Sequence, residues 1–307
     1  MKKQLLIAAI AASMTSVAMA DVSISGAMFA KYANVDNAPA GTADTNTLTH
    51  ETDLDINGSF GDTSVNIHMD ANTGNSATFA STITTKIIDG LTVKAGTYAG
   101  GKSVMSAKSG AATKSLVTYD AGIAKVTWEN NASGTSNNVG VSGSVEGIAL
   151  SFNNKKTQDE FKVSGAVAGV AFAFHNIDAD GTNTDKNSYE ISGTVSDIKL
   201  TYAAGNADSS AQIDGDAFFG NTASISGNGD DFSGFSASTD LAGNTVTFKH
   251  FKQDSATATR DATTNKFTVV RALAGGTTLT ANYAALDVNN GTTGDKDTFD
   301  IKLAVSF

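Results

Sequence analysis

The chain has 307 residues with no cysteine, one proline and 30 glycines, and its formal net charge is −10. The lack of cysteine excludes a disulfide framework and a thiolate metal site, and the negative charge disfavours nucleic acid as a partner. Glycine, threonine, serine and asparagine are abundant and no helical periodicity is present, so the composition predicts an all-β chain.

Residues 1–20 predict a secretory signal peptide. Lys2 and Lys3 precede a short apolar run, and small residues up to Ala20 fit a cleavage site after that position. The run is too short for a membrane-spanning helix, which needs about 20 apolar residues. We therefore expect a signal peptide over 1–20 and an exported domain over 21–307, with a net charge of −12 once the two lysines are removed.

The second predicted strand carries the clearest group of charges. Glu51, Asp53 and Asp55 occupy alternate positions, opposite in direction to Leu54 and Ile56, so their side chains share one face, about 7 Å apart. Together with Asp70 they predict an acidic stripe. If this face lines a pore, the stripe concentrates cations. The alternative is a solvated polar face with no selective role.

Hairpins with a strict two-residue alternation repeat along the chain. Each places large apolar residues on one face, small or polar residues on the other, and a tight turn between the strands. Three copies align closely: VGVSGSVEGIALSF (139–152), FKVSGAVAGVAFAF (161–174) and YEISGTVSDIKLTY (189–202). Looser copies turn near Gly61, Gly90, Gly122, Gly243 and Gly275. Eight hairpins, with a first strand near 22–34 and a last one near 297–307, give 18 strands.

The remaining connections are longer and polar, which predicts two different rims. They cover residues 35–46, 100–113, 177–187, 204–231, 253–265 and 286–296. Short turns at one rim and long loops at the other are typical of an outer-membrane barrel, whose large apolar face contacts lipid and whose polar face lines water. Aromatic residues that recur five to seven positions from the turns fit a girdle at the membrane interface. We predict a transmembrane antiparallel β-barrel of 16–18 strands.

Basic residues also fall on the predicted polar face. Lys94 and Lys125 are expected to line the pore, which gives its wall a mixed sign. Lys102 and Lys108 lie in the 100–113 loop and are expected to line the pore if that loop folds inward.

Arg271 is an exception to the alternation. Its position places it with Phe267 and Val269 on the lipid-facing side, where an arginine at the bilayer centre costs about 2–4 kcal/mol. Either its long side chain extends to the membrane surface, or a local bulge resets the strand register.

The last ten residues, TFDIKLAVSF, alternate up to the terminal Phe307. With the mature start DVSISGAMFAKY and the hairpin LDINGSFGDTSVNIHMD (54–70), this ending resembles the Gram-negative outer-membrane porin family, in particular its general diffusion members. The resemblance implies a location in the cell outer membrane and a homotrimer of water-filled, usually 16-stranded barrels. It also implies contact with membrane lipid and lipopolysaccharide, and recognition of Phe307 as an assembly signal by the barrel assembly machinery.

The chain departs from that family in the third loop, which folds into the pore of its members. Here the corresponding loop, 100–113, lacks the Pro-Glu-Phe-Gly-Gly motif and has no acidic residue. The predicted lumen strands also lack the arginine ladder that faces this loop. The family's charge pattern therefore does not carry over to this pore.

The pattern predicts a passive diffusion channel for small hydrophilic solutes or ions, with cation preference if the acidic stripe lines the pore. The four histidines have no ligand spacing and no catalytic motif is present, so we expect no enzymatic activity, no cofactor and no metal. The alternative is a secreted or surface β-rich structural or adhesive protein. In that protein the large apolar residues are enclosed between sheets.

Overall fold

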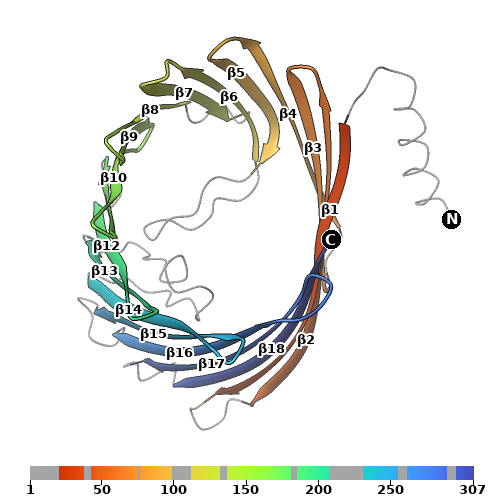
Figure 1. Cartoon of the computed structure of the whole chain (residues 1–307), viewed down its shortest axis with the longest axis vertical. Coiled ribbons are helices and arrows are strands. Elements are labelled where there is room, and N and C mark those ends of the chain that lie inside the picture. Colours follow the sequence, from red (N-terminus) through yellow and green to blue (C-terminus); the bar gives the residue numbers. More distant parts are fainter. Residues whose placement is uncertain are drawn as a thin grey trace, which may run out of the picture.

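The computed structural model describes residues 21–37, 43–74, 77–98, 112–131, 137–180, 185–207, 231–254, 261–288 and 295–307. Their strands form a single 18-stranded sheet (Figure 1). The strands are β1 (Asp21–Asn37), β2 (Thr45–Phe60), β3 (Thr63–Asn72), β4 (Thr78–Ile88), β5 (Leu91–Tyr98), β6 (Ala112–Asp120), β7 (Ala124–Asn131), β8 (Asn137–Val145), β9 (Ile148–Lys155), β10 (Gln158–Val167), β11 (Val170–Ala179), β12 (Lys186–Val195), β13 (Ile198–Ala207), β14 (Asp231–Leu241), β15 (Asn244–Asp254), β16 (Ala262–Ala272), β17 (Thr277–Val288) and β18 (Lys296–Ser306). No helix in these ranges is long and apolar enough to cross a membrane.

The sheet closes on itself between its first and last strands. Each strand pairs antiparallel with its neighbours in sequence, and β1 also pairs with β18. The seam ends in two backbone hydrogen bonds: Gly26 N–H donates to the Phe307 carbonyl at 2.9 Å, and Phe307 N–H donates to the Gly26 carbonyl at 3.0 Å. Lipid offers no partner to backbone groups, so a closed ring is the form in which a sheet can span a membrane. The predicted β-barrel is confirmed, with 18 strands.

Eight tight turns join the strands at one rim, as the hairpin pattern predicts. In four of them both central residues have positive φ: Glu146-Gly147, Ala168-Gly169, Ser196-Asp197 and Ala242-Gly243. This is the type I′ conformation, whose twist matches that of the flanking strands. The positions of these turns, predicted from the sequence, are therefore confirmed.

The opposite rim differs from the prediction in two respects. Strands continue into the predicted loops: β1 reaches Asn37 and β13 reaches Ala207. In addition, only Lys156 and Thr157 connect β9 to β10, so this rim also has a tight connection. Polar composition misled the boundary assignment, because antiparallel pairing continues beyond the apolar band into regions that contact water.

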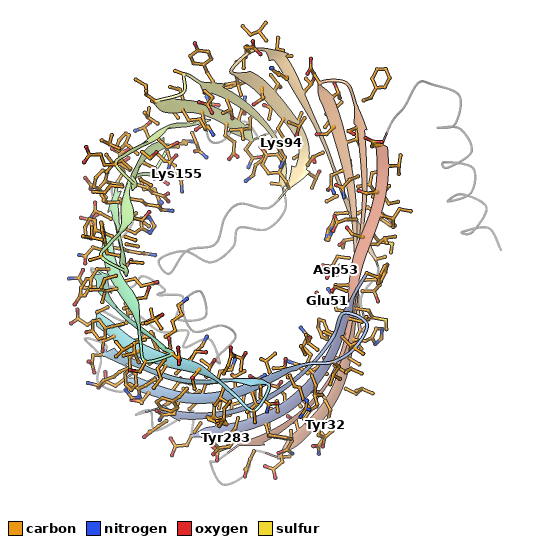
Figure 2. The ribbon with its side chains drawn as sticks, viewed as in Figure 1. Tyr32, Glu51, Asp53, Lys94, Lys155 and Tyr283 are labelled. Atoms are coloured by element: carbon orange, nitrogen blue, oxygen red, sulfur yellow. The ribbon has the colours of Figure 1, made fainter. Side chains whose placement is uncertain are left out.

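The outer face of the barrel is apolar and open to its surroundings. Leu200 and Ile301 are 45% and 42% exposed, respectively. Aromatic residues also lie on this face, most of them on adjacent strands. They are Tyr32, Trp128, Phe152, Phe161, Phe174, Tyr189, Tyr202, Phe235, Phe248, Phe267, Tyr283 and Phe299. Figure 2 shows Tyr32 and Tyr283 on the outside of the wall. The large apolar residues of this face are thus not enclosed between sheets, and the adhesive-protein alternative is wrong in its fold.

Arg271 remains on the outer face without a bulge. It lies opposite Asn244 on β15 and Leu279 on β17, and the register on both sides continues without a shift. The bulge interpretation is therefore wrong here. Because Arg271 is exposed and one residue from the end of β16, its side chain can extend to the membrane surface at the short-turn rim.

Candidate functional site

The four predicted acidic residues lie on the inner face of β2 and β3, where they form the acidic stripe. Asp53 is directly opposite Asp70, and Asp55 is opposite His68. Carboxylate oxygens of Glu51, Asp53 and Asp70 lie within 4.8 Å of one another. Figure 2 shows Glu51 and Asp53 pointing from the wall toward the lumen. Strand alternation puts these carboxylates on one face, and the β2–β3 register brings Asp70 among them.

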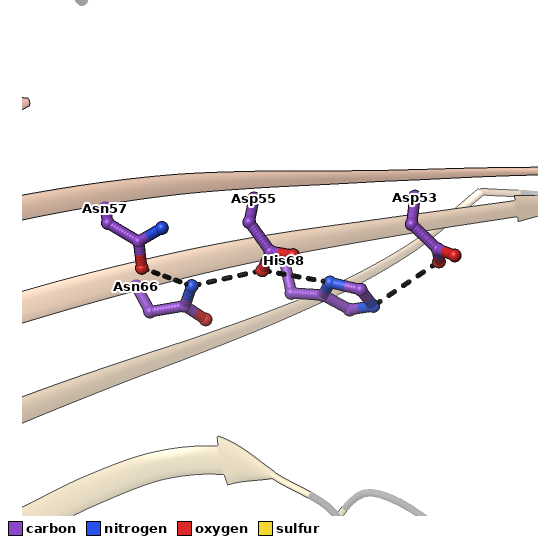
Figure 3. A network of polar contacts seen from close by, with 5 residues as sticks. All are labelled: Asp53, Asp55, Asn57, Asn66 and His68. Carbon is purple, nitrogen blue, oxygen red and sulfur yellow. Dashed lines mark hydrogen bonds and ion pairs between the residues drawn. The ribbon is translucent and has the colours of Figure 1, made fainter. Parts of the chain in front are cut away.

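Neighbouring side chains hold two of these carboxylates in place (Figure 3). The His68 ring lies between them, with Nδ1 3.1 Å from Asp55 Oδ1 and Nε2 3.8 Å from Asp53 Oδ1. Asn66 Nδ2 donates to Asp55 Oδ1 at 3.1 Å and to Asn57 Oδ1 at 2.8 Å. The stripe is therefore a fixed array of negative charge with polar support.

The acidic stripe can attract cations without a defined metal site. Its carboxylates are only half-buried, with 32% and 36% of the Asp53 and Asp55 side chains exposed. A cation also lies beside it: Lys302 Nζ is 3.9 Å from the centroid of the Phe29 ring, and Phe29 is opposite Glu51. Hydrated carboxylates raise the local cation concentration, which is the property relevant to a pore, and the single ammonium group of Lys302 reduces this effect.

Basic side chains occupy the inner face on the other side of the barrel. Lys162 on β10 is opposite Ser151 on β9, and Ser151 shares a face with Lys155 of the same strand. Lys199 on β13 is opposite Thr194 on β12. Figure 1 shows β10 to β13 across the barrel from β1 and β3, and Figure 2 shows Lys155 on the inner side of this wall. The inner charges are thus unevenly distributed, with clustered acids on β2 and β3, and with lysines on β9 to β13 that share this wall with Glu160 and Glu190.

A second cluster of charges lies on β5, β6 and β7. Lys94 Nζ is 4.4 Å from the Tyr98 ring centroid and Lys114 Nζ is 5.5 Å from it. Lys114 Nζ is also 3.7 Å from Glu129 Oε1, and the Tyr98 hydroxyl donates to Glu129 Oε2 at 3.4 Å. The predicted Lys94 therefore belongs to a mixed cluster. Lys114 and Glu129 could have been found from the alternation, since Glu129 shares parity with Lys125.

The other predicted positions divide between the described and undescribed parts of the chain. Lys125 is on the inner face, and its Nζ is 3.2 Å from Asp120 Oδ2. Lys102 and Lys108 fall outside the described residues, as does the 100–113 loop up to residue 111. Phe307 lies at the β1–β18 seam and is 68% exposed.

The inner face also carries aromatic residues that the sequence analysis did not assign to it. Phe232 and Phe251 are each 3% exposed, and their ring centroids are 6.0 Å apart. Phe232 is three residues from the outward Phe235, so alternation places it inside. The three-residue spacing between Phe232 and Phe235 could have shown from the sequence that Phe232 faces the lumen.

A buried ion pair on β9 and β10 supplies a stability prediction. Glu160 is 4% exposed, its Oε1 contacts Lys155 Nζ, and Gln158 Nε2 donates to the same oxygen at 2.8 Å. We expect Lys155→Met to lower the free energy of unfolding by about 2 kcal/mol, because the change leaves a buried carboxylate without its cation. The measurement is the urea midpoint of unfolding in detergent micelles.

The matched control for Lys155→Met is Lys86→Met. Lys86 contacts Asp89 at 2.5 Å and lowers the pKa of this turn carboxyl through a hydrogen bond, but the Asp89 side chain is 98% exposed. Water can replace the lost ammonium group there, so the control should unfold at nearly the wild-type midpoint. Equal losses in both variants would contradict the role assigned to burial of Glu160.

No protein-family model matches the sequence, and no curated protein matches it. Solved structures do match. The chain is similar to Pseudomonas aeruginosa OccK11 (OpdR), with a TM-score of 0.72, 12% identity, and 94% of this chain and 96% of that chain covered. P. aeruginosa OccK9 (OpdG) matches with a TM-score of 0.71 and 12% identity, over 94% of this chain and 98% of that chain. Acinetobacter baumannii OccAB3 matches with a TM-score of 0.70 and 9% identity, over 94% of this chain and 99% of that chain. The fold of this chain is therefore that of the Gram-negative outer-membrane porins, in agreement with its apolar outer surface.

Proposed function

We propose that the protein is a passive diffusion channel for small hydrophilic solutes and ions in the outer membrane. The observation that carries this function is the closed ring of 18 strands with an apolar outer face and a charged inner face. Such a wall stabilises the protein in lipid while its inner groups replace part of a solute's hydration. A concentration gradient drives this transport, so the function requires neither a cofactor nor a catalytic residue.

The uneven distribution of the inner charges suggests how the channel treats ions. The acidic stripe of Glu51, Asp53, Asp55 and Asp70 offers cations a favourable path along β2 and β3, while lysines line the opposite side. We propose a cation preference that originates in the stripe and is limited by the basic wall. Opposite charges across a lumen also orient dipolar solutes as they pass.

Four partners follow from the same proposal: membrane lipid, lipopolysaccharide, the barrel assembly machinery and identical subunits. The aromatic girdle and apolar band would contact lipid and lipopolysaccharide, and the exposed Phe307 would be read by the barrel assembly machinery during insertion. We also propose a homotrimer, as the resemblance to porins implies. Chemical cross-linking in detergent would test the trimer directly.

The channel function is tested by planar bilayer recording. We expect protein purified in detergent to produce discrete conductance steps when it is added to one chamber, because each insertion opens a water-filled path. Heat-denatured protein from the same preparation is the control. Folded protein that inserts into liposomes but gives neither conductance steps nor solute flux would contradict the proposal.

A further inference from the structure

A polar recess of about 340 Å³ lies in the inner wall of β1 to β4, toward the short-turn rim. We call it the β1–β4 recess and define it by seven of its lining residues: Asp21, Ser23, Asn57, Ser59, Ser64, Asn66 and Thr84. Two rows of directly opposed residues build it, one linking Ser23, Asn57 and Asn66 and the other linking Ser59, Ser64 and Thr84. No lysine or arginine lines the recess, so its chemistry differs from that of the basic wall.

The orientation of the two amides in this recess follows from Asp55. An ionised carboxylate only accepts hydrogen bonds, so the Asn66 atom 3.1 Å from Asp55 Oδ1 must be the amide nitrogen. The other N–H of Asn66 donates to Asn57 Oδ1 at 2.8 Å (Figure 3). His68 holds Asp55 from the other side, with its Nδ1 3.1 Å from the same oxygen. Asp55, held by His68, therefore sets the orientation of the Asn66 amide, and Asn66 sets that of Asn57.

This arrangement leaves one donor and one acceptor side by side. Asn57 Nδ2 and Asn66 Oδ1 have no hydrogen-bond partner among the residues that the structure describes. The hydroxyls of Ser23, Ser59 and Ser64 surround them in the recess. Each hydroxyl of a vicinal diol both donates and accepts, so such a diol satisfies an amide N–H and an amide oxygen together. Asp21 also lines the recess, opposite Ser59, and its carboxylate repels an anionic ligand while it can accept a hydrogen bond from a hydroxyl. Asp55 is already bound by Asn66 and His68.

We propose that the β1–β4 recess is a weak binding subsite for neutral vicinal polyols of monosaccharide size. The proposal rests on the channel function and adds a class of solute to it. The subsite lies near the short-turn rim, away from the opposite rim with its longer connections. Weak, reversible binding at the wall raises the local concentration of solute and still allows its release, as conduction requires.

Single-channel recording with D-glucose as the probe tests this subsite. Triethylene glycol is the reference solute, since it has a similar size and is uncharged but carries no vicinal diol. We expect glucose to lower the conductance in a saturable way beyond the effect of the glycol at equal viscosity. Asn57→Ala removes the free donor and should weaken the apparent glucose affinity roughly fivefold.

Asn282→Ala is the matched control. Asn282 is also an inward asparagine anchored on a carboxylate, with Nδ2 2.9 Å from Asp300 Oδ1, but its oxygen already accepts from Thr268 at 2.7 Å. It should leave the glucose effect unchanged. Ser64→Ala is a second test variant if Asn57→Ala yields no folded barrel.

The outcomes separate the two proposals. Conductance steps with no difference between glucose and the glycol would overturn the subsite and leave the channel function intact. So would an unchanged glucose affinity in folded Asn57→Ala. A protein that gives no conductance at all would contradict the channel function itself.

Discussion

The combined variant Glu51→Gln, Asp53→Asn and Asp70→Asn should lower the cation-to-anion permeability ratio by about fivefold. These three carboxylates lie within 4.8 Å of one another on the inner wall, so a cation passing there interacts with all of them. A unit charge at 4 Å contributes about 1 kcal/mol in water, and salt reduces the contribution. We assign about 1 kcal/mol to the removed triad after screening, which corresponds to a factor of about five.

The reversal potential in a salt gradient measures this change. Loss of the triad leaves the lysines of the opposite wall in place, so the variant should approach or cross into anion preference. Asp300→Asn is the matched control, because it neutralises a single inward carboxylate on β18 outside the triad and should shift the potential much less. A variant that conducts with an unchanged reversal potential would show that ions do not pass near the acidic stripe.

Gly26→Val should prevent the barrel from closing between β1 and β18. A Cβ at this position would lie 2.7 Å from the backbone oxygen of Asp53 and 2.8 Å from the Phe307 ring. The ring can move, but the backbone oxygen belongs to the β1–β2 ladder and cannot move without breaking it. A branched side chain therefore strains both sides of the seam. Overpacking of this kind typically costs about 1–3 kcal/mol, and here it acts on the contact that completes the ring.

Heat modifiability on gel electrophoresis measures closure, because a folded barrel resists detergent until it is boiled. We expect little or no heat-modifiable Gly26→Val protein. Gly193→Ala is the matched control: this glycine is also mid-strand on the outer face, but its nearest neighbouring atoms would be 3.7 Å from an added Cβ, an ordinary contact. If Gly26→Val folds as well as Gly193→Ala, the fit of Phe307 over Gly26 does not control closure.

The acidic stripe shows which features of the pore wall can be predicted from the local sequence pattern and which cannot. That Glu51, Asp53 and Asp55 share a face was readable from their alternation, and Asp70 could be added because a tight turn at Gly61 fixes the β2–β3 pairing. The position of His68 between two carboxylates and the anchoring of Asn66 on Asp55 were not predicted. The turn at Gly61 fixes which residues are opposite each other, but the contacts of His68 with Asp53 and of Asn66 with Asp55 are diagonal and depend on side-chain rotamers, which the alternation does not specify.

The outer surface illustrates the same division. Alternation assigned Trp128, Leu200 and Ile301 to one face, and their exposure in the structure agrees with contact with lipid. The polar composition beyond the aromatic girdle hid the true strand ends, such as Asn37 and Ala207. Strand pairing beyond the lipid is decided by backbone hydrogen bonds to the neighbour, and composition carries little information about them.

The sequence by itself determined the alternating faces and the eight tight turns, because each depends on residues within one hairpin, and it limited the strand count to 16–18. Only the tertiary structure decided that β1 meets β18, that Phe307 lies over Gly26, and that lysines of β9 to β13 lie across the lumen from the acids of β2 and β3. Closure joins segments from opposite ends of the chain, and the distance across the lumen depends on the number, tilt and stagger of all the strands together.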